Sequence, residues 1–257
     1  MSWIDMHCHI PMLEIDLATT LEKTKSAGVE RLIAIGMIPQ DNDQVLKLAE
    51  DHFPTIACTL GVHPHDAKHF GPDSIAYLRK NVSKPCVVGI GEIGLDFYYN
   101  NSEREKQIEA FREQLKLADE LKMPVQIHTR DAEDETIEIL KELGGRVRGT
   151  IHCFTGTQKL ADACIRLGLN ISFSGIVTFK NAEDLRNVAR SVPIDRMHVE
   201  TDAPFLTPAP FRGKKNDPSY VHVTGEFVAQ LKGLPLQEFK AQMKANALNT
   251  FPKLIWN

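Results

Sequence analysis

The sequence of 257 residues predicts an α/β fold in which eight parallel strands alternate with helices, as in a (β/α)8 TIM barrel. Three observations favour this fold. Eight short apolar segments recur along the chain, helical segments separate several of them, and no linker or low-complexity run divides the sequence. We therefore expect a single domain over residues 1–257, since α/β barrels commonly have about 200–250 residues.

The predicted strands are mostly apolar throughout, instead of alternating between apolar and polar residues. This pattern is typical of parallel strands that helices cover on their outer side. In chain order, the predicted strands are Trp3–Met6, Arg31–Ile35, Thr55–Leu60, Cys86–Ile90, Val125–Ile127, Gly149–Ile151, Asn170–Phe173 and Arg196–Val199.

Apolar residues at helical spacing lie between several of these strands. The clearest helix is predicted to begin at Ser102, where Glu105 three residues later completes a capping box, and to continue to about Lys122. A weaker apolar stripe begins at Leu17 and is predicted to end at Gly28, a residue type suited to a helix C-cap. Further helices are predicted over Asp162–Leu167, Ala182–Arg190 and Pro235–Leu254.

Composition limits the classes of function. The formal net charge of −4 argues against a broad nucleic-acid surface, although a narrow site that grips one phosphate or one strand end is compatible with it. No apolar run approaches the ~18–20 residues that cross a bilayer, so no membrane partner is expected. Five cysteines are an odd number in a chain too long to need disulfides, which favours a reducing cytoplasm.

Five separated fragments end apolar runs in side chains that can bind metal ions. Those side chains are His7, His9, Glu92, His128, His152 and Asp202. In the predicted barrel, all five fragments occupy C-terminal ends of strands, where catalytic groups gather. Three or four ligands describe one ion, whereas six describe two adjacent ions that share a bridging carboxylate. We expect two divalent ions, Mg²⁺, Mn²⁺ or Zn²⁺, because histidine ligands disfavour a pure Mg²⁺ site.

Spacing and surroundings indicate what several of these side chains do. His7 and His9 are two residues apart, so both project to the same side of an extended strand, whereas Cys8 faces the other way. Glu92 lies among glycines that let the backbone turn after the strand, and its two oxygens can each bind one ion. Asp202 is suited to act as a general base.

Other residues keep two interpretations. His128 or His152, taken singly, is as often a hydrogen-bonded core histidine as a ligand, and only the complete set favours metal binding. Glu200 either supports the site or has a plain structural role. Cys153 fits a buried small hydrophobic residue better than a zinc ligand.

The motifs that carry these residues make the chain similar to the TatD family of metal-dependent hydrolases, a branch of the amidohydrolase-like barrel superfamily. The resemblance covers almost the whole length, and the chain departs from the usual pattern at Met6 and Pro11. The matching segments are Ile4–His9, Gly61–His65, Gly89–Phe97, Gln126–Arg130, His152–Gly156, Glu200–Leu206 and Arg212–Pro218.

The resemblance implies a two-ion site in which Glu92 bridges the ions. It implies that one ion is held by His7, His9 and Asp202, and the other by His128 and His152. It also implies an exonuclease-like phosphodiesterase activity directed at DNA, which several members of the family have.

Side chains on the same rim are candidates for contacts with substrate. By the family parallel, His63 contacts a phosphate or a leaving group, whereas His65 is as readily a surface residue. Arg212 stands in the one basic cluster near a rim loop, with Lys214 and Lys215, and we expect it to bind substrate.

Further polar and aromatic residues leave alternatives open. Arg130 either clamps a phosphate or forms a surface ion pair with Asp131 or Asp134. Phe173 and Phe179 offer stacking surfaces for bases, although aromatic residues at such spacing are more often core.

We expect a metal-dependent hydrolase that acts on ester bonds. Its most specific form is a two-metal deoxyribonuclease, exonuclease-like, that acts on single strands or strand ends, with DNA as partner and no obligatory protein partner. Asp202 and Glu92 are its expected catalytic residues. An amide or ester hydrolase or deacylase with the same ions is the alternative, because one barrel hosts many chemistries. A non-catalytic metal-binding protein is a third hypothesis, which the complete ligand set disfavours.

Overall fold

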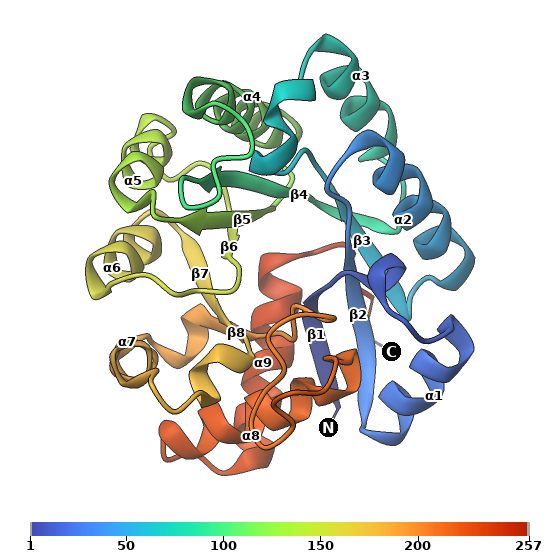
Figure 1. Cartoon of the computed structure of the whole chain (residues 1–257), viewed down its shortest axis with the longest axis vertical. Coiled ribbons are helices and arrows are strands. Elements are labelled where there is room, and N and C mark those ends of the chain that lie inside the picture. The colour runs from blue at the N-terminus through green and yellow to red at the C-terminus, as the bar shows by residue number, and fades with distance from the viewer. Residues whose placement is uncertain (1, 256–257) are drawn as a thin grey trace.

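The chain forms a barrel of eight parallel strands with helices on the outside (Figure 1). The computed structural model describes residues 2–255, without the side chains of residues 39 and 40. Each strand pairs with the next one in the sequence. The strands are β1 Trp3–Cys8, β2 Val29–Ile35, β3 Ile56–Leu60, β4 Val87–Asp96, β5 Val125–Arg130, β6 Gly149–Ile151, β7 Leu169–Phe173 and β8 Met197–Val199. The predicted α/β TIM-barrel fold is confirmed.

Helices follow the strands around the outer surface. The α-helices are α1 Leu17–Ser26, α2 Pro39–His52, α3 Pro72–Asn81, α4 Arg104–Leu121, α5 Glu133–Glu142, α6 Gln158–Arg166, α7 Glu183–Ser191, α8 Val221–Leu231 and α9 Leu236–Thr250. Short 3-10 helices are η1 Ile10–Met12, η2 Pro64–His69, η3 Gly175–Thr178, η4 Ile194–Arg196 and η5 Pro218–Tyr220. Among the described residues, no helix has both the length and the apolar character needed to span a membrane.

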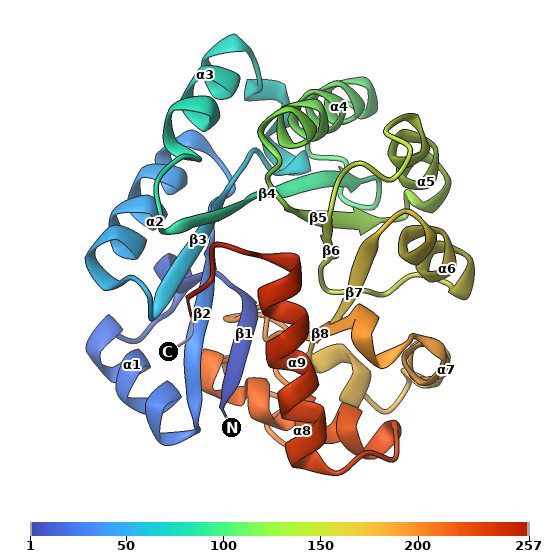
Figure 2. The ribbon, with the colours of Figure 1, turned by 180° about the vertical axis from the view of Figure 1, so that it is seen from behind.

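One end of the barrel is covered by the C-terminal helix. In the view from behind, α9 lies in front of the barrel opening (Figure 2), and it contacts both β1 and β8. A small buried cluster joins Ile4, Ile33 and Val88 of three strands to Phe251 and Leu254, which follow α9. These residues fill the end of the barrel at which the strands begin. The end at which the strands finish is therefore the one available for a site.

The barrel closes at the C-terminal end of β1. The segment after β8 bridges back to β1 through Cys8 and Ala203, and the His9 N–H donates to the Ala203 carbonyl at 2.8 Å. The Asp202 N–H donates to the His7 carbonyl at 2.9 Å. These backbone bonds make the first and last predicted metal ligands spatial neighbours.

The predicted strand boundaries hold to within a few residues except at β4. This strand runs on to Asp96 instead of ending at Ile90, so Glu92 lies inside the strand, and the predicted turn after Ile90 is wrong. The glycines instead permit close strand approach: a Cβ on Gly91 would lie 2.7 Å from the Gln126 Cβ in β5.

The predicted start of the clearest helix is also wrong. This helix, α4, begins at Arg104, and no side chain caps its N-terminus. The Ser102 hydroxyl donates to the His65 carbonyl at 2.7 Å, and it accepts from the Lys68 N–H at 3.1 Å. Ser102 therefore ties η2 to the α4 approach, and the expected capping box with Glu105 does not form.

Candidate metal centre

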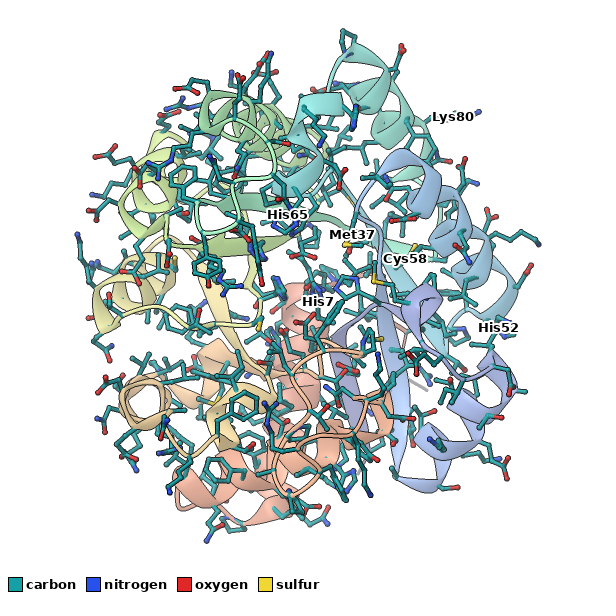
Figure 3. All side chains as sticks on the ribbon, viewed as in Figure 1. His7, Met37, His52, Cys58, His65 and Lys80 are labelled. Atoms are coloured by element: carbon teal, nitrogen blue, oxygen red, sulfur yellow. The ribbon has the colours of Figure 1, made fainter. Side chains whose placement is uncertain are left out.

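The six predicted metal ligands meet at the C-terminal ends of the strands. Figure 3 places His7 near the centre of the barrel, whereas His52 lies at its outer edge. Three overlapping groups of ligand atoms form there, each with its atoms within 4.8 Å of one another. The groups are His7, His9 and Asp202; His7, Glu92 and His152; and His63, Glu92 and His128.

The first group joins the two ends of the barrel sheet. Nε2 of His7 lies 3.3 Å from Nε2 of His9. Asp202 Oδ1 lies 3.3 Å from His9 Nε2 and 3.7 Å from His7 Nε2. His7 and His9 therefore project to the same side, as their spacing predicts. Cys8 between them is buried and places its thiol against the Ile33 carbonyl, away from the group.

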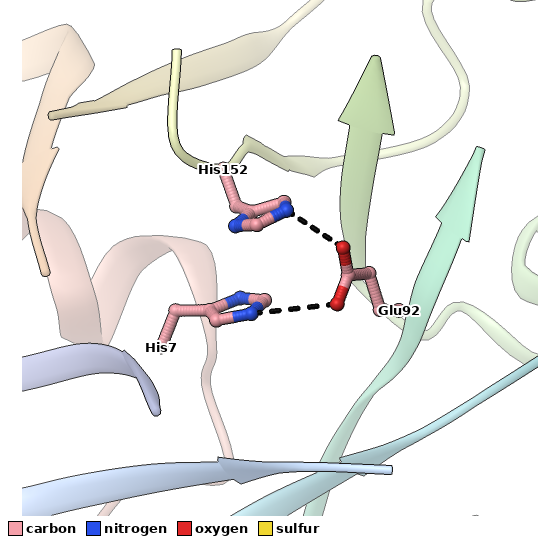
Figure 4. A group of neighbouring side chains, drawn as sticks. All are labelled: His7, Glu92 and His152. Carbon is pink, nitrogen blue, oxygen red and sulfur yellow. Dashed lines mark ion pairs between the residues drawn. The ribbon is translucent and has the colours of Figure 1, made fainter. Parts of the chain in front are cut away.

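Glu92 of β4 lies between two sets of histidines. Its Oε2 is 3.5 Å from His7 Nε2, and its Oε1 is 2.7 Å from His152 Nε2 (Figure 4). The same Oε1 is 3.0 Å from His128 Nδ1. The two oxygens of one carboxylate thus face different groups of nitrogen atoms, which is the geometry that a bridge between two ions requires.

Both carboxylates of the cluster are ionised. Burial alone would raise the pKa of Glu92, but the charge of His152, with hydrogen bonds from His128 and His152, holds that pKa well below its usual value. Burial also opposes ionisation of Asp202, and the hydrogen bond and charge of His9, with the charge of His7, lower the pKa of Asp202. Two buried carboxylates among histidines form a donor set that suits divalent metal ions.

Side chains behind the cluster orient two of its histidines. The Gln126 amide donates to the Met6 carbonyl at 2.7 Å, which leaves its Oε1 to accept from His7 Nδ1 at 2.8 Å. Asp96 Oδ2 lies 3.1 Å from His128 Nε2, so the other ring nitrogen faces Glu92. Such partners fix the ring orientation and tautomer of a metal-binding histidine.

Glu200, for which the sequence left two interpretations, supports the site. Its Oε1 lies 3.3 Å from His152 Nδ1 and accepts from the Cys153 N–H at 2.6 Å. Its Oε2 accepts from the Ser172 hydroxyl. Glu200 therefore holds both the ring of His152 and the backbone that follows it.

His63 lies inside the cluster, with its Nε2 3.3 Å from Glu92 Oε1. Burial disfavours its charged form more than Glu92 favours it, so the pKa of His63 is lowered to about 4. Its Nδ1 accepts from the His65 N–H at 3.1 Å, which leaves the proton of the neutral ring on Nε2. His63 is therefore a neutral donor aimed at the cluster.

The side chains of Arg212 and Lys215 contact different parts of the structure. The Arg212 guanidinium lies 3.9 Å from the centre of the Phe179 ring and donates to the Thr207 carbonyl at 3.2 Å. It lines an open pocket of about 500 Å³ between the loops that follow β7 and β8. Lys215 instead pairs with Glu14 at 2.9 Å. The expected basic cluster is thus divided, and Arg212 is the member that faces a pocket.

Two further rim residues have defined partners. His65 is partly exposed, and its Nε2 lies 3.0 Å from Asp96 Oδ2. Arg130 pairs with neither Asp131 nor Asp134; its guanidinium lies over two tyrosine rings.

Cys153 and Phe173 were both expected to be buried, and only Phe173 is fully buried. Cys153 is only partly buried and contacts the Ser174 hydroxyl through its thiol at 3.3 Å, so it is not a buried hydrophobic residue. Phe173 is fully buried core, as the more common interpretation of such an aromatic residue has it.

Asp96 and Gln126 are the supporting residues that sequence reasoning did not single out. Both stand inside the motifs of the family resemblance, in Gly89–Phe97 and Gln126–Arg130. That placement was the available signal. Met6, one of the departures from the usual pattern, is buried in the small core cluster, and its backbone carbonyl accepts a hydrogen bond from the Gln126 amide.

Comparison with known proteins agrees with this geometry. A family model described as TatD related DNase matches residues 4–252. The chain belongs to the TatD family. This result establishes a metal-dependent hydrolase that acts on ester bonds.

Named relatives of the TatD family cover nearly the whole chain. The uncharacterized metal-dependent hydrolase YabD of Bacillus subtilis is 38% identical over 250 residues, which are 96% of this chain and 98% of that protein. The 3'-5' ssDNA/RNA exonuclease TatD of Erwinia amylovora is 36% identical over 242 residues, which are 92% of this chain and 93% of that protein. The crystal structure of YJJV, a TatD homolog from Escherichia coli, superposes with a TM-score of 0.91 at 28% identity and covers 97% of this chain and 98% of that one.

Proposed function

We propose that this TatD-family hydrolase is a two-metal phosphodiesterase that removes nucleotides from the end of single-stranded DNA. The observation that carries the proposal is the position of Glu92, whose two oxygens face different groups of histidines at 3.5 Å and 2.7 Å. A relative over almost the full length is named as an exonuclease on single-stranded DNA and RNA, which supports this substrate class. The expected ions are two of Mg²⁺, Mn²⁺ or Zn²⁺.

The proposed ligand assignment is the one that the family resemblance implies, and the closeness of the candidate ligand atoms supports it. Glu92 would bridge the two ions. His7, His9 and Asp202 would hold one ion, and His128 and His152 would hold the other. When bound, the ions supply a water of lowered pKa and positive charge that stabilises phosphoryl oxygens.

Asp202 is the proposed general base. Its side chain is nearly buried and its pKa is lowered, because the hydrogen bond and charge of His9 outweigh the effect of burial. It is therefore ionised at neutral pH and accepts a proton from the water that attacks phosphorus. As the oxygen–phosphorus bond forms, the bond from phosphorus to the oxygen of the leaving nucleotide breaks.

His63 and Arg212 are the proposed contacts with substrate. His63 carries its proton on Nε2, which points into the cluster, so it donates to a phosphate oxygen or to the leaving oxygen without adding charge. Arg212 lies in the open pocket beside Phe179 and Lys180, where it meets a flanking phosphate of a longer strand.

The experiment uses metal-free protein reconstituted separately with Mg²⁺, Mn²⁺ and Zn²⁺. Single-stranded DNA labelled at either end, duplex DNA, RNA, and small amide, ester and aminoacyl substrates are tested in parallel. We expect stepwise release of nucleotides from single-stranded DNA and slower cleavage of blunt duplex. Hydrolysis of amides or esters without cleavage of any nucleic acid overturns the proposal and selects the deacylase alternative.

A matched pair of variants separates substrate contact from structure. Arg212→Ala is expected to reduce cleavage of an oligonucleotide more than cleavage of a dinucleotide, because the dinucleotide lacks the flanking phosphate. Lys215→Ala is the control, since Lys215 is already paired with Glu14. Equal losses on both substrates place Arg212 at the reacting phosphate and exclude the flanking contact.

We also propose that the enzyme works in the cytoplasm as one domain over residues 1–257. All five cysteines are free, as is typical of a reducing compartment. The eight strands form one sheet in sequence order, which supports a single domain.

A further inference from the structure

Large exposed apolar side chains gather around the metal centre. Within residues 2–255, five such side chains are strongly exposed, and four of them follow the C-terminal ends of strands. These four are Met12 after β1, Tyr98 and Tyr99 after β4, and Phe205 after β8. Tyr98, Tyr99 and Phe205 are 58%, 54% and 50% exposed. Aromatic rings left in water beside an active site indicate a surface that receives a ligand.

Tyr98 and Tyr99 are held in place by the carboxylate that also supports the metal centre. Asp96 Oδ1 accepts from the Tyr98 N–H at 3.1 Å and from the Tyr99 N–H at 2.9 Å. Its Oδ2 lies 3.1 Å from His128 Nε2 and 3.0 Å from His65 Nε2. One buried side chain therefore fixes the tyrosine turn relative to the cluster, so the two rings are placed by the same support as the ligands.

Arg130 completes the tyrosine surface. Its guanidinium carbon lies 4.0 Å from the centre of the Tyr98 ring and 4.8 Å from that of Tyr99. The two tyrosine rings meet edge to face, with centroids 4.9 Å apart. No carboxylate in the described part of the chain pairs with this guanidinium, although Asp131 follows it directly. The surface thus combines two rings with a positive charge that remains available to a phosphate.

Aromatic rings contact histidines at two places in or beside the cluster. Tyr99 meets His65 edge to face with centroids 5.5 Å apart. Phe205 meets His9 in the same manner with centroids 6.0 Å apart. His65 lies beside His128, whereas His9 belongs to the group of Asp202. One aromatic surface therefore lies beside the His128 part of the cluster, and the other lies beside the His9 and Asp202 part.

We propose that the Tyr98–Tyr99 surface and Phe205 bind the two nucleobases on either side of the scissile phosphate. This inference rests on the proposed nuclease function and extends it to the substrate's bases. A nucleobase is the occupant that the chemistry selects, because it is a flat ring attached within one nucleotide of the reacting phosphate. Every base has a π-face, so these contacts bind bases of any sequence. They require unpaired bases, which gives a physical reason for single-strand preference.

The test combines protein variants that lack one aromatic ring with substrates that lack one base. Tyr99→Leu and Phe205→Leu keep apolar bulk but lack a π-face, whereas Tyr99→Phe and Phe205→Tyr keep the ring. Ile255→Ala serves as the control, because Ile255 is an exposed apolar residue that does not follow the C-terminal end of a strand. The substrates are a short oligothymidylate and two versions in which the base on one or the other side of the cleaved bond is replaced by an abasic site.

On the intact oligonucleotide, each leucine variant is expected to lose about ten-fold in kcat/KM, the factor that corresponds to 1.4 kcal/mol of stacking. The ring-retaining variants and the control are expected to stay within about two-fold of wild type. Each leucine variant is expected to match wild type on one abasic substrate, and the two variants on opposite ones. Equal losses of the leucine variants on intact and abasic substrates overturn the proposal.

A binding measurement without turnover gives a second readout. Metal-free protein in EDTA is titrated with an oligothymidylate that carries a terminal 2-aminopurine, whose fluorescence is quenched by stacking. Quenching by wild type and Tyr99→Phe, lost in Tyr99→Leu or Phe205→Leu, supports the proposal. Undiminished quenching by both leucine variants overturns it. If wild-type protein cleaves no nucleic acid with any ion, the proposed function itself fails, which is a separate outcome.

Discussion

The imidazole rings of His7 and His152 lie parallel, with their centroids 3.8 Å apart and an angle of 9° between their planes. One ring comes from β1 and the other from the residue after β6, yet both point Nε2 at Glu92 (Figure 4). They approach different oxygens of that carboxylate. Glu92 is therefore the residue on which both halves of the proposed two-ion site depend.

The first prediction concerns metal content. Glu92→Gln keeps the size of the side chain but removes its charge and one acceptor oxygen, so we expect the variant to lose both ions. His128→Ala is expected to lose chiefly one ion, because His128 belongs to only one proposed half. Elemental analysis after gel filtration checks this against wild type, which is expected to hold close to two ions per chain. A Glu92→Gln protein that retains two ions excludes the bridge.

The second prediction concerns the proposed base. Asp202→Asn is expected to lower kcat by at least about 10²-fold, since a positioned general base contributes roughly 10²–10⁴-fold. The residue has a φ of 57°, a left-handed conformation that asparagine also adopts, so the melting temperature is expected to change little. Steady-state kinetics and a thermal melt give both quantities. Near-normal turnover with intact metal content would remove Asp202 from proton transfer.

The third prediction concerns Glu200, which supports His152 without facing the other ligands. Glu200→Gln keeps an acceptor for the Cys153 N–H but removes the charge beside His152 Nδ1. Loss of such a supporting partner typically costs 10–100-fold in metal affinity. Competition with a chelator is expected to show weaker binding of one ion and unchanged binding of the other. Equal weakening of both ions contradicts a role that acts through His152 alone.

The clustering of the six candidate ligands was predictable from the sequence, because each is a metal-binding residue type that closely follows an apolar run. The residues that support these ligands were not predictable in this way. Gln126 in β5 forms a hydrogen bond with His7 in β1. This contact depends on the curvature of the barrel, which a local sequence pattern does not predict. Asp96 looks like an ordinary loop carboxylate until β4 is seen to extend that far.

The predicted boundaries of β4 and α4 were wrong because glycine and serine can each serve more than one structural purpose. Glycines after Ile90 indicate a turn when only local conformation is considered, but here they allow β4 and β5 to approach closely. A serine three residues before a glutamate indicates a capping box, but the Ser102 hydroxyl is committed to His65. In both cases a contact distant in sequence decides the role of the residue.

The fourth prediction concerns packing between β1 and α8. A Cβ on Gly225 would lie 2.3 Å from the Trp3 ring, which is fully buried and cannot move aside. Gly225→Ala is therefore expected to lower the free energy of unfolding by about 1–3 kcal/mol, the usual cost of overpacking. Gly71→Ala is the control, since nothing lies within 4 Å of its Cβ position. Urea denaturation of both variants tests the difference, and equal stability of the two contradicts it.

The last prediction concerns acid stability and His198 of β8. Burial lowers the pKa of His198 from 6.5 to about 3, because no carboxylate compensates for the loss of solvent around the charged ring. Between these two values the unfolded chain binds one more proton at this site than the folded protein. The folded protein therefore loses stability as pH falls below about 6.5, by up to about 1.4 kcal/mol per pH unit from this histidine.

His198→Gln tests this contribution, because glutamine is neutral at every pH and can still accept from Asn170, which now donates to His198 Nε2. The free energy of unfolding is measured by urea titration at pH 7, 6, 5 and 4 in EDTA for both proteins. We expect the variant to be less stable than wild type or equal to it at pH 7, and to lose less stability on acidification. Parallel pH profiles for the two proteins would show that His198 is protonated as readily in the folded chain as in the unfolded one.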